Sequence, residues 1–385
     1  MVADKAGDSY DMVFTGININ RAWKPDNTWF GQYTGAYVQA SLGGANDAQA
    51  HAIARQTAET GRYEPGSPEF IAAYNASISN PDLTTGSKFQ DASKYYHADG
   101  NYNFSHLWDA VDIQVGGSYR KYSLNSSGTI YTDYDGPIDY SEYGVYTQLQ
   151  KEFDLNGGMS LKLTGSARYD KSEFFDGFVS PRISAGLTIN QNHNIRASVQ
   201  TGFRNPTTQD LFIGLDAGRA ILVGSAPANL DRYSDSYDVS TAGQIGFGQP
   251  ATITQTGAAA YTNSYLASSV SAFAASTNPA DLVIGNSALV KPEKITSMEV
   301  GYRGKLNKVI VDMSVYYNKY QDFISGENVV APFYGTVGDN SLSIAAIANG
   351  DYQVYQTYTN SKADVNSYGG SIGLTTKIFG NFDLG

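Results

Sequence analysis

Long stretches of the chain alternate strictly between apolar and polar residues. These runs occupy residues 111–121, 143–153, 161–169, 183–190, 194–204, 298–306 and 309–317. Alternation with a period of two places one face of a strand against apolar surroundings and the other face against water. A soluble sandwich gives the same pattern, but its strands are usually about 5–6 residues long. Most of the runs here reach roughly ten residues, close to the 9–11 that a membrane-crossing strand needs.

The segments between these runs differ in length in a regular order. Short links lie at 105–109, 154–158, 191–193 and 307–308. Longer connections lie at 125–140, 172–177, 206–294 and about 325–363, and they alternate with the short links. Short turns at one end of the strands and longer loops at the other are typical of an outer-membrane barrel. The pattern therefore predicts an all-β, antiparallel transmembrane β-barrel wall of about ten strands, counted from about residue 9.

The longer connections are interpreted as extracellular loops. They cover about 21–94, 125–140, 206–294 and 325–363. The third loop begins at Pro206, which cannot donate a ladder hydrogen bond and so ends the preceding strand. Within the first loop, "NDAQAHAIARQTAETGR" (46–62) begins with Asn and is rich in Ala, Gln and Glu, which predicts a short helix.

The composition supports a wall with one apolar and one wet side. Only 16% of residues are charged, 13% are aromatic, and 29 are Tyr, whose ring and hydroxyl suit such boundaries. The net charge of −11 argues against nucleic acid as a partner. Cysteine is absent, which excludes disulfides and thiolate chemistry. No apolar run is long enough for a membrane helix, and we expect any export signal to lie outside this chain.

Several stretches resemble a known family in their order and spacing. They are "ARYDKSEFFDGFVSPRISAGLTIN" (167–190), "SVQTGFRNPTTQDLF" (198–212), "ALVKPEKITSMEVGYRGKL" (288–306) and "VDMSVYYNKYQDFI" (311–324). The family is that of the TonB-dependent outer-membrane receptors, and the similarity is greatest to those of the Bacteroidetes type. The resemblance covers most of residues 95–385.

The resemblance implies a 22-stranded barrel in the cell outer membrane, surrounded by outer-membrane lipids and closed by an N-terminal plug domain. Such a receptor binds a siderophore, vitamin, glycan or peptide outside the cell and imports it with energy from the TonB-ExbB-ExbD complex. Ten strands alone would leave two unpaired edges in lipid, which is very costly. We therefore expect this chain to be part of the barrel domain, with the plug and the remaining strands absent from it. A surface lipoprotein over the barrel mouth would fit a glycan or peptide importer, but no residue here requires one.

The resemblance also suggests which side chains face the plug. In the family, a barrel glutamate in a "KPE…E-G" strand often docks against plug arginines, and Glu299 matches that position beside Arg303. A second acid is often found in a later strand, where this chain has Ser371. The alternative for Glu299 is a solvated charge in the lumen. Four arginines project to the polar face: Arg120, Arg168, Arg196 and Arg204. They suit an anionic ligand or an acidic plug surface, and the alternative is that they form ordinary ion pairs in the lumen.

Two groups of residues are candidates for ligand binding. The connection 125–140 contains aromatic residues beside acids, which suit a polyhydroxylated ligand because a ring covers its apolar face and a carboxylate accepts from its hydroxyls. These residues are Tyr131, Asp133, Tyr134 and Asp135. The alternative is that such tyrosines belong to the aromatic girdle of the barrel. Arg204 and Asn205, at the rim of the lumen, form the second group.

No arrangement in the sequence indicates catalysis, a cofactor or a metal. "GGSIG" (369–373) fits the G-x-S-x-G elbow of serine hydrolases, but it lies inside a continuing strand pattern without a following helix. The four histidines share no metal-ligand spacing. We therefore expect a transporter that is not an enzyme. The alternative function is a passive porin, whose lumen would be open and filled with water.

Overall fold

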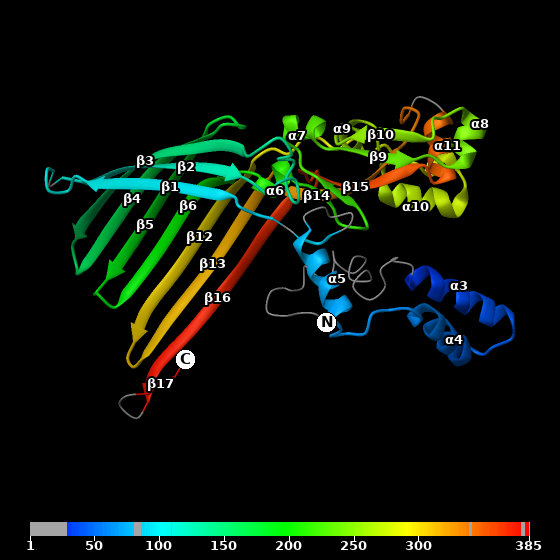
Figure 1. Ribbon diagram of the computed structural model, residues 1–385. Helices are drawn as coiled ribbons and strands as arrows, with labels where there is room; N and C mark the ends of the chain where they lie inside the picture. The colour runs from blue at the N-terminus through cyan, green and yellow to red at the C-terminus, as the bar shows by residue number, and fades with distance from the viewer. Residues whose placement is uncertain are drawn as a thin grey trace. The chain divides into compact units, whose positions relative to one another are not determined.

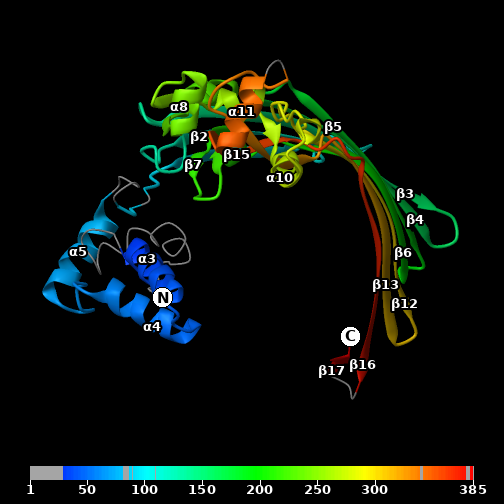
Figure 2. The same ribbon diagram turned by 90° about the vertical axis from the view of Figure 1, so that its right-hand side faces the viewer.

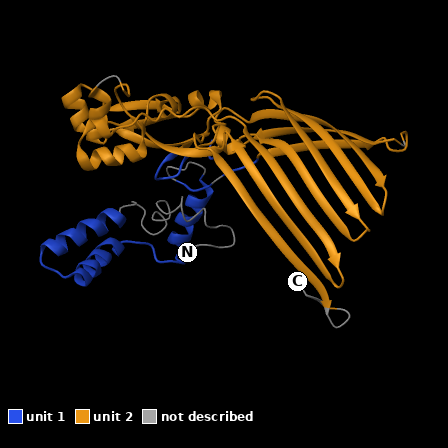
Figure 3. Ribbon diagram, turned by 180° about the vertical axis from the view of Figure 1, so that it is seen from behind, with its two compact units in different colours: residues 1–92, 126–130, 215–221 blue, residues 93–125, 131–214, 222–385 orange. Residues whose placement is uncertain are grey.

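The computed structural model describes residues 29–80, 86–88, 90–108, 110–338, 341–378 and 382–384. The chain divides into two compact units (Figure 3). Unit 1 contains residues 1–92, 126–130 and 215–221, and unit 2 contains residues 93–125, 131–214 and 222–385. The strand predicted from about residue 9 lies outside the described residues.

The described part of unit 1 contains three helices, α3 (Trp29–Leu42), α4 (Asp47–Glu59) and α5 (Pro68–Ser79). Helix α4 begins with a capping box, in which the side chain of Asn46 accepts from the Gln49 N–H while the Gln49 side chain accepts from the Asn46 N–H. The helix predicted within 46–62 is confirmed. Helices α3 and α5 were not predicted, and α3 carries glycines and aromatic residues that lower helix propensity.

Unit 2 contains a sheet of ten strands that curves strongly in Figure 2, and every neighbouring pair is antiparallel. In their order across the sheet, the strands are β1 (Lys94–Asn103), β2 (Asp112–Leu124), β3 (Ile138–Leu155), β4 (Met159–Ser172), β5 (Phe178–Ile189), β6 (His193–Arg204), β12 (Glu293–Leu306), β13 (Val309–Gln321), β16 (Val365–Ile378) and β17 (Phe382–Leu384). The predicted all-β antiparallel fold is confirmed.

The strand register separates apolar from polar residues across the whole sheet. Directly paired residues share a face, and neighbouring residues of one strand lie on opposite faces. One row of paired residues consists of Ile113, Leu149, Gly165, Ile183, Val199, Met298, Tyr317 and Tyr368. The next row, on the other face, consists of Gln114, Gln148, Ser166, Arg182, Gln200, Ser297, Asn318 and Ser367. We call these two surfaces the apolar face and the polar face.

The connections follow the predicted alternation only in part, because the connection between β4 and β5 (173–177) is shorter than the one between β1 and β2 (104–111). Tight turns join β3 to β4, β5 to β6, and β12 to β13, and the last two place Asn190, Gln191 and Asn307 at positive φ. The long connections follow β6 and β13 at the other end of the strands (Figure 1). No helix in the described part of the chain has both the length and the apolar character needed to cross a membrane.

The two longest connections between strands of the ten-stranded sheet fold into small elements, which we call the loop assembly (the described residues of 205–292 and 322–364). Those after β6 are α6 (Thr208–Phe212), β7 (Gly214–Asp216), β8 (Ile221–Val223), α7 (Pro227–Arg232), β9 (Ser234–Asp238), α8 (Thr241–Phe247), β10 (Thr252–Thr256), α9 (Ala258–Thr262), β11 (Tyr265–Leu266), α10 (Ala267–Ser276) and the 3-10 helix η1 (Pro279–Asp281). Those after β13 are β14 (Ile324–Pro332), α11 (Ser341–Asn349) and β15 (Tyr352–Asn360). They form a two-stranded sheet, β10-β9, and a five-stranded sheet, β11-β14-β15-β8-β7.

The loop assembly has its own hydrophobic core. One cluster joins the two long connections and consists of Tyr265, Val270, Phe273, Val330, Val337 and Ile347. A second cluster consists of Val239, Phe333, Tyr334 and Ala346. Burial raises the pKa of both Tyr237 and Tyr355, whose hydroxyls lie 3.4 Å apart. The segment 325–363 was predicted as a loop, yet it contains most of β14 and all of β15. The alternation pattern did not predict β14, because Val329, Val330 and Ala331 are consecutive buried residues.

Candidate functional site

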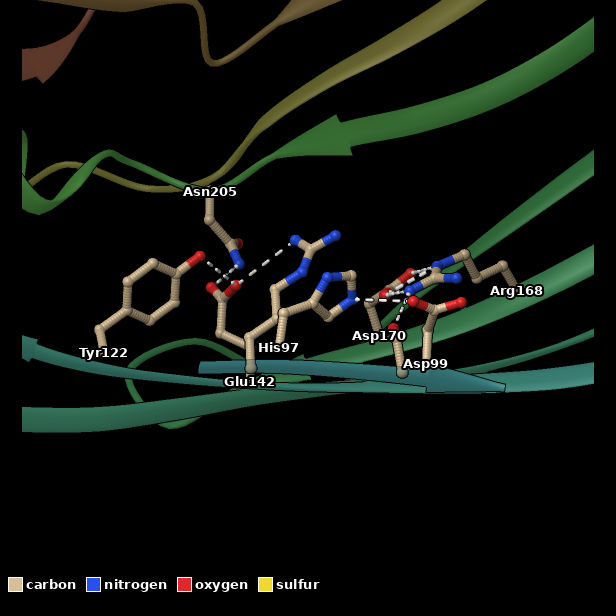
Figure 4. Close-up of polar contacts among 9 residues, drawn as sticks. His97, Asp99, Tyr122, Glu142, Arg168, Asp170 and Asn205 are labelled. Carbon is tan, nitrogen blue, oxygen red and sulfur yellow. Dashed lines mark hydrogen bonds and ion pairs between the residues drawn. The ribbon is translucent and has the colours of Figure 1, made fainter. Parts of the chain in front are cut away.

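A cleft of about 480 Å³ lies at the end of the sheet nearest the loop assembly. Its lining comes from β2, β3, β4, the end of β6 and the residues that follow β6. An adjoining hollow of about 460 Å³ continues along the sheet. The residues that line both are Ser118, Arg120, Arg168, Asp170 and Phe203. Figure 4 shows the polar contacts in this region.

Glu142 on β3 holds one side of the cleft together. The β2–β3 register places it directly opposite Arg120, and their side chains lie 3.9 Å apart. Asn205 donates from Nδ2 to Oε1 of Glu142 at 2.7 Å, and the Tyr122 hydroxyl lies 3.5 Å from Oε2 (Figure 4). This carboxylate therefore links β2 and β3 to the start of the long connection after β6.

Arg168 and Asp170 form a second pair on β4. They are two residues apart and so share the polar face. Arg168 donates from Nε to both oxygens of Asp170 at 2.8 Å and from an Nη to the hydroxyl of Ser118 at 2.9 Å. Both side chains cross the backbone of Gly144, where a Cβ would lie only 2.2–2.4 Å from them. Glycine at this position leaves the space that the pair occupies.

Arg204 at the end of β6 pairs with Glu293 at the start of β12. An Nη of Arg204 donates to Oε2 of Glu293 at 2.8 Å, and the same oxygen accepts from the backbone N–H of Ile324 at 3.1 Å. Glu293 is only 7% exposed. The consecutive residues Arg204 and Asn205 thus bond to carboxylates on different strands, which fixes the chain where it leaves the sheet.

Of the six residues predicted to bind ligand, Arg204 and Asn205 line the cleft. Tyr131 is buried, pairs with Ile213 in an isolated bridge and lies 3.2 Å from the Thr208 hydroxyl oxygen. Asp133 is also buried. Neither is among the cleft-lining residues.

The two remaining ligand candidates lie at the surface outside the cleft. Tyr134 is half exposed, and its pKa is raised by partial burial and then by the carboxylates of Asp133 and Asp235. Asp135 is exposed. A ligand role for these residues and for Tyr131 and Asp133 stays a prediction.

The residues predicted to face the plug lie further along the polar face, apart from Arg168. Arg196 lies 3.5 Å from Glu299 and 3.7 Å from Asp312, and Arg303 lies 3.7 Å from Asp312. Glu299 and Arg303 lie on the same polar face, as their parity predicts, and the ion pair of Glu299 is with Arg196. Ser371, at the position of the expected second acid, has its hydroxyl 2.9 Å from that of Ser314.

Sequence reasoning missed the acidic and hydroxyl groups of the cleft. Those that line the cleft are Ser118, Tyr122, Glu142 and Asp170, and Glu293 binds the cleft residue Arg204. Alternation marks each strand's polar face, but only the register shows which polar residues meet. Among the described residues, no cluster of three or more His, Asp and Glu side chains could hold a metal ion. The cleft offers many hydrogen-bond donors and acceptors, an arrangement suited to binding.

The family model described as "TonB dependent receptor-like, beta-barrel" matches residues 3–385. The chain belongs to this family. It is 30% identical over 105 residues to the vitamin B12 transporter BtuB of Vibrio vulnificus (strain CMCP6), an alignment that covers 27% of this chain and 16% of BtuB.

Similar solved structures include siderophore receptors. The receptor PirA of Pseudomonas aeruginosa aligns with a TM-score of 0.42 and 14% identity, over 76% of this chain and 42% of PirA. The PirA of Acinetobacter baumannii aligns with a TM-score of 0.40 and 12% identity, over 76% of this chain and 35% of that protein. The chain thus spans less than half the length of each of these relatives.

Proposed function

We propose that this chain supplies barrel wall and extracellular ligand contacts to an outer-membrane receptor that imports a scarce nutrient with TonB-coupled energy. The observation that carries the proposal is the family match over residues 3–385. The cleft supports it, because most of its polar strand residues belong to the polar face, at the end of the strands where the loop assembly lies. The names of the relatives, a vitamin B12 transporter and siderophore receptors, suggest the range of ligands.

In this proposal, the apolar face contacts the outer-membrane lipids and the polar face lines the lumen. A plug domain and the TonB-ExbB-ExbD complex would complete the machinery, and a surface lipoprotein would be an additional partner. Membership of the Bacteroidetes-type subgroup is also proposed, on the basis of the resembling stretches 167–190 and 288–306. The ligand would bind first in the cleft, where Arg204 and Asn205 are anchored.

We expect the double variant Arg204→Gln/Asn205→Ala to lower nutrient uptake at least tenfold, because it removes two cleft donors and their anchors on Glu142 and Glu293. The measurement is growth of cells that depend on the intact protein for one nutrient, tested across siderophores, vitamins, glycans and peptides. Arg182→Gln is the matched control, because Arg182 lies on the polar face but lines neither hollow. Equal uptake by the double variant and the control would contradict the assignment of the cleft.

The same cells separate active import from a passive porin. A TonB-dependent receptor loses uptake when TonB is deleted, whereas a porin keeps it and conducts ions in planar bilayers without an energy source. Uptake that is unchanged in the TonB deletion would overturn the proposed function and favour the porin.

We further propose that the network of Arg196, Glu299, Arg303 and Asp312 contacts the plug. The side chains of these four residues are 41–63% exposed, so each could form further bonds with an apposed surface. The ion pairs within the network contribute little on their own, because they are solvent-exposed. Its position on β6, β12 and β13 places it away from the cleft, which makes the two roles separable.

Replacing Glu299 with Lys should weaken plug contact, because it places a third cation beside Arg196 and Arg303. We expect cells with this variant to become several-fold more sensitive to vancomycin, which a closed outer membrane excludes. The control is Glu152→Gln, near the end of β3 that lies away from the cleft. This variant should leave the sensitivity to vancomycin unchanged. Unchanged sensitivity in Glu299→Lys, with normal amounts of protein in the membrane, would remove the plug assignment.

A further inference from the structure

Each arginine of the cleft is matched by its own carboxylate. Arg120 faces Glu142 at 3.9 Å, and Arg168 contacts Asp170 at 2.7 Å. The third pair is Arg204 with Glu293 at 2.8 Å. The three pairs come from different strands, so positive and negative charges are balanced across the whole cleft.

The other charged groups near the cleft are also engaged. The ammonium group of Lys171 donates to the Phe175 carbonyl at 2.7 Å. In the adjoining hollow, His97 lies 3.8 Å from Asp99. The cleft therefore does not present a concentrated positive field of the kind that attracts an anion.

This balance determines which ligands the cleft can accept at low cost. An anionic group placed between Arg120 and Arg204 would also approach the carboxylates of Glu142 and Asp170, and like charges at close range are unfavourable. Binding an anion would break an existing ion pair and leave a desolvated carboxylate, such as the buried Glu293, without its partner. A neutral hydroxyl avoids both costs, because it accepts from a guanidinium and donates to a carboxylate at the same time.

The paired side chains still have free hydrogen-bonding capacity. The side chains of Arg120 and Arg204 are 43% and 56% exposed, so both remain accessible to a ligand despite their ion pairs. Asn205, Tyr122 and Ser118 add amide and hydroxyl groups to the same surface. Neutral donors and acceptors of this kind, interleaved with compensated charges, match a molecule that carries many hydroxyls.

The shape of the site also limits the ligand. Two hollows of about 480 and 460 Å³ share five lining residues and so form one elongated surface. Each hollow is within the usual range of about 300–1,000 Å³ for small-molecule sites. The rings of Tyr122, Tyr146 and Phe203 are part of this lining, and aromatic surface covers the apolar C–H faces of a ligand. An elongated site with repeated polar pairs suits a ligand built from several similar units.

We infer that the cleft binds an uncharged oligosaccharide and discriminates against carboxylated or sulfated ones. The inference rests on the proposed function, since it names the ligand class for the same cleft. The polar pairs Arg120–Glu142 and Arg168–Asp170 contact sugar hydroxyls, and the guanidinium of Arg204 contacts the unit nearest the loop assembly.

The test uses the intact protein in detergent on an array of neutral oligosaccharides and of oligosaccharides that contain uronate or sulfate groups. We expect the wild type to bind neutral members at least tenfold more tightly than charged members of equal length. The double variant Glu142→Gln/Asp170→Asn removes two negative charges and keeps the side-chain shapes. Its preference should reverse, because Arg120 and Arg168 then face the ligand uncompensated. Glu152→Gln, which is outside both hollows, is the control and should behave as the wild type.

Binding of charged members only, binding of no member, or an unchanged preference in the double variant would each overturn the inference. Circular dichroism confirms that each variant retains its β-sheet, and Glu142→Gln alone serves where the double variant does not fold. The proposed function is tested separately by the loss of nutrient uptake in the TonB deletion. TonB-dependent uptake of a charged nutrient would therefore reject the ligand class and keep the receptor.

Discussion

Replacing Val199 with arginine is expected to lower the free energy of unfolding of the barrel by about 2–4 kcal/mol, the cost of a cation on the lipid face near the bilayer midplane. Val199 is 50% exposed and lies between Ile183 and Met298 in the apolar row. In the proposed function, the exposed side of Val199 contacts lipid rather than water. The measurement is urea unfolding of the intact protein in lipid vesicles, followed by circular dichroism.

The adjacent position provides the matched control. Gln200 is the next residue of β6 and lies on the polar face between Arg182 and Ser297. Gln200→Arg should change the free energy of unfolding by no more than about 0.5 kcal/mol, because the side chain remains in water. Similar losses for both variants would mean that the two faces do not differ in solvent, and the assignment of the apolar face to lipid would fail.

The second large effect is expected in the loop assembly. Asp351 is 2% exposed and accepts three hydrogen bonds, from the N–H and hydroxyl of Ser240 and from the Tyr334 hydroxyl. Asp351→Ala leaves the buried Tyr334 hydroxyl without its acceptor, which costs about 1–3 kcal/mol, and the two Ser240 donors, which are only partly buried, add less. We expect the free energy of local opening to fall by about 2–4 kcal/mol in total. Hydrogen exchange of peptides from α8 and β14 measures this change.

A double variant tests whether the effect comes from these bonds. Tyr334→Phe removes one of the donors, so adding it to Asp351→Ala should cost less than the sum of the two single changes. Asp238→Ala, at an exposed position of β9, is the control and should alter exchange little. Additive losses in the double variant would show that Asp351 acts through something other than these hydrogen bonds.

The sequence predicted the wall well because the environment of a wall strand is simple. Each long strand has an apolar face and a polar face, so alternation alone assigns Val199 and Gln200 to their faces. The same reasoning placed Arg168 and Arg204 on the polar face. Strand register could not be predicted in this way, because it depends on contacts between strands. For example, β6 pairs with β12, although a long insertion separates them in the sequence.

Alternation did not predict the elements of the loop assembly or the acidic and hydroxyl residues of the cleft. Strands β9 and β10 have five residues each and β11 has two, too few to give a periodic pattern. Their positions depend on distant partners, as when Tyr265 pairs with Val330. In the same way, no residue near Glu293 in the sequence indicates that its carboxylate binds Arg204. These features are set by tertiary contacts, which local propensity does not encode.

The shared core of the loop assembly constrains how such receptors can diversify. Strand β11 belongs to the connection after β6 and β14 to the connection after β13, yet they pair, and Phe273 and Ile347 meet in one cluster. Recombination that exchanged only one of the two connections with a relative would combine two connections whose core side chains do not fit each other. Apolar side chains of the loop assembly would then be exposed. The two segments are therefore expected to be inherited together and to covary, so an engineer who grafts a new specificity must transplant both.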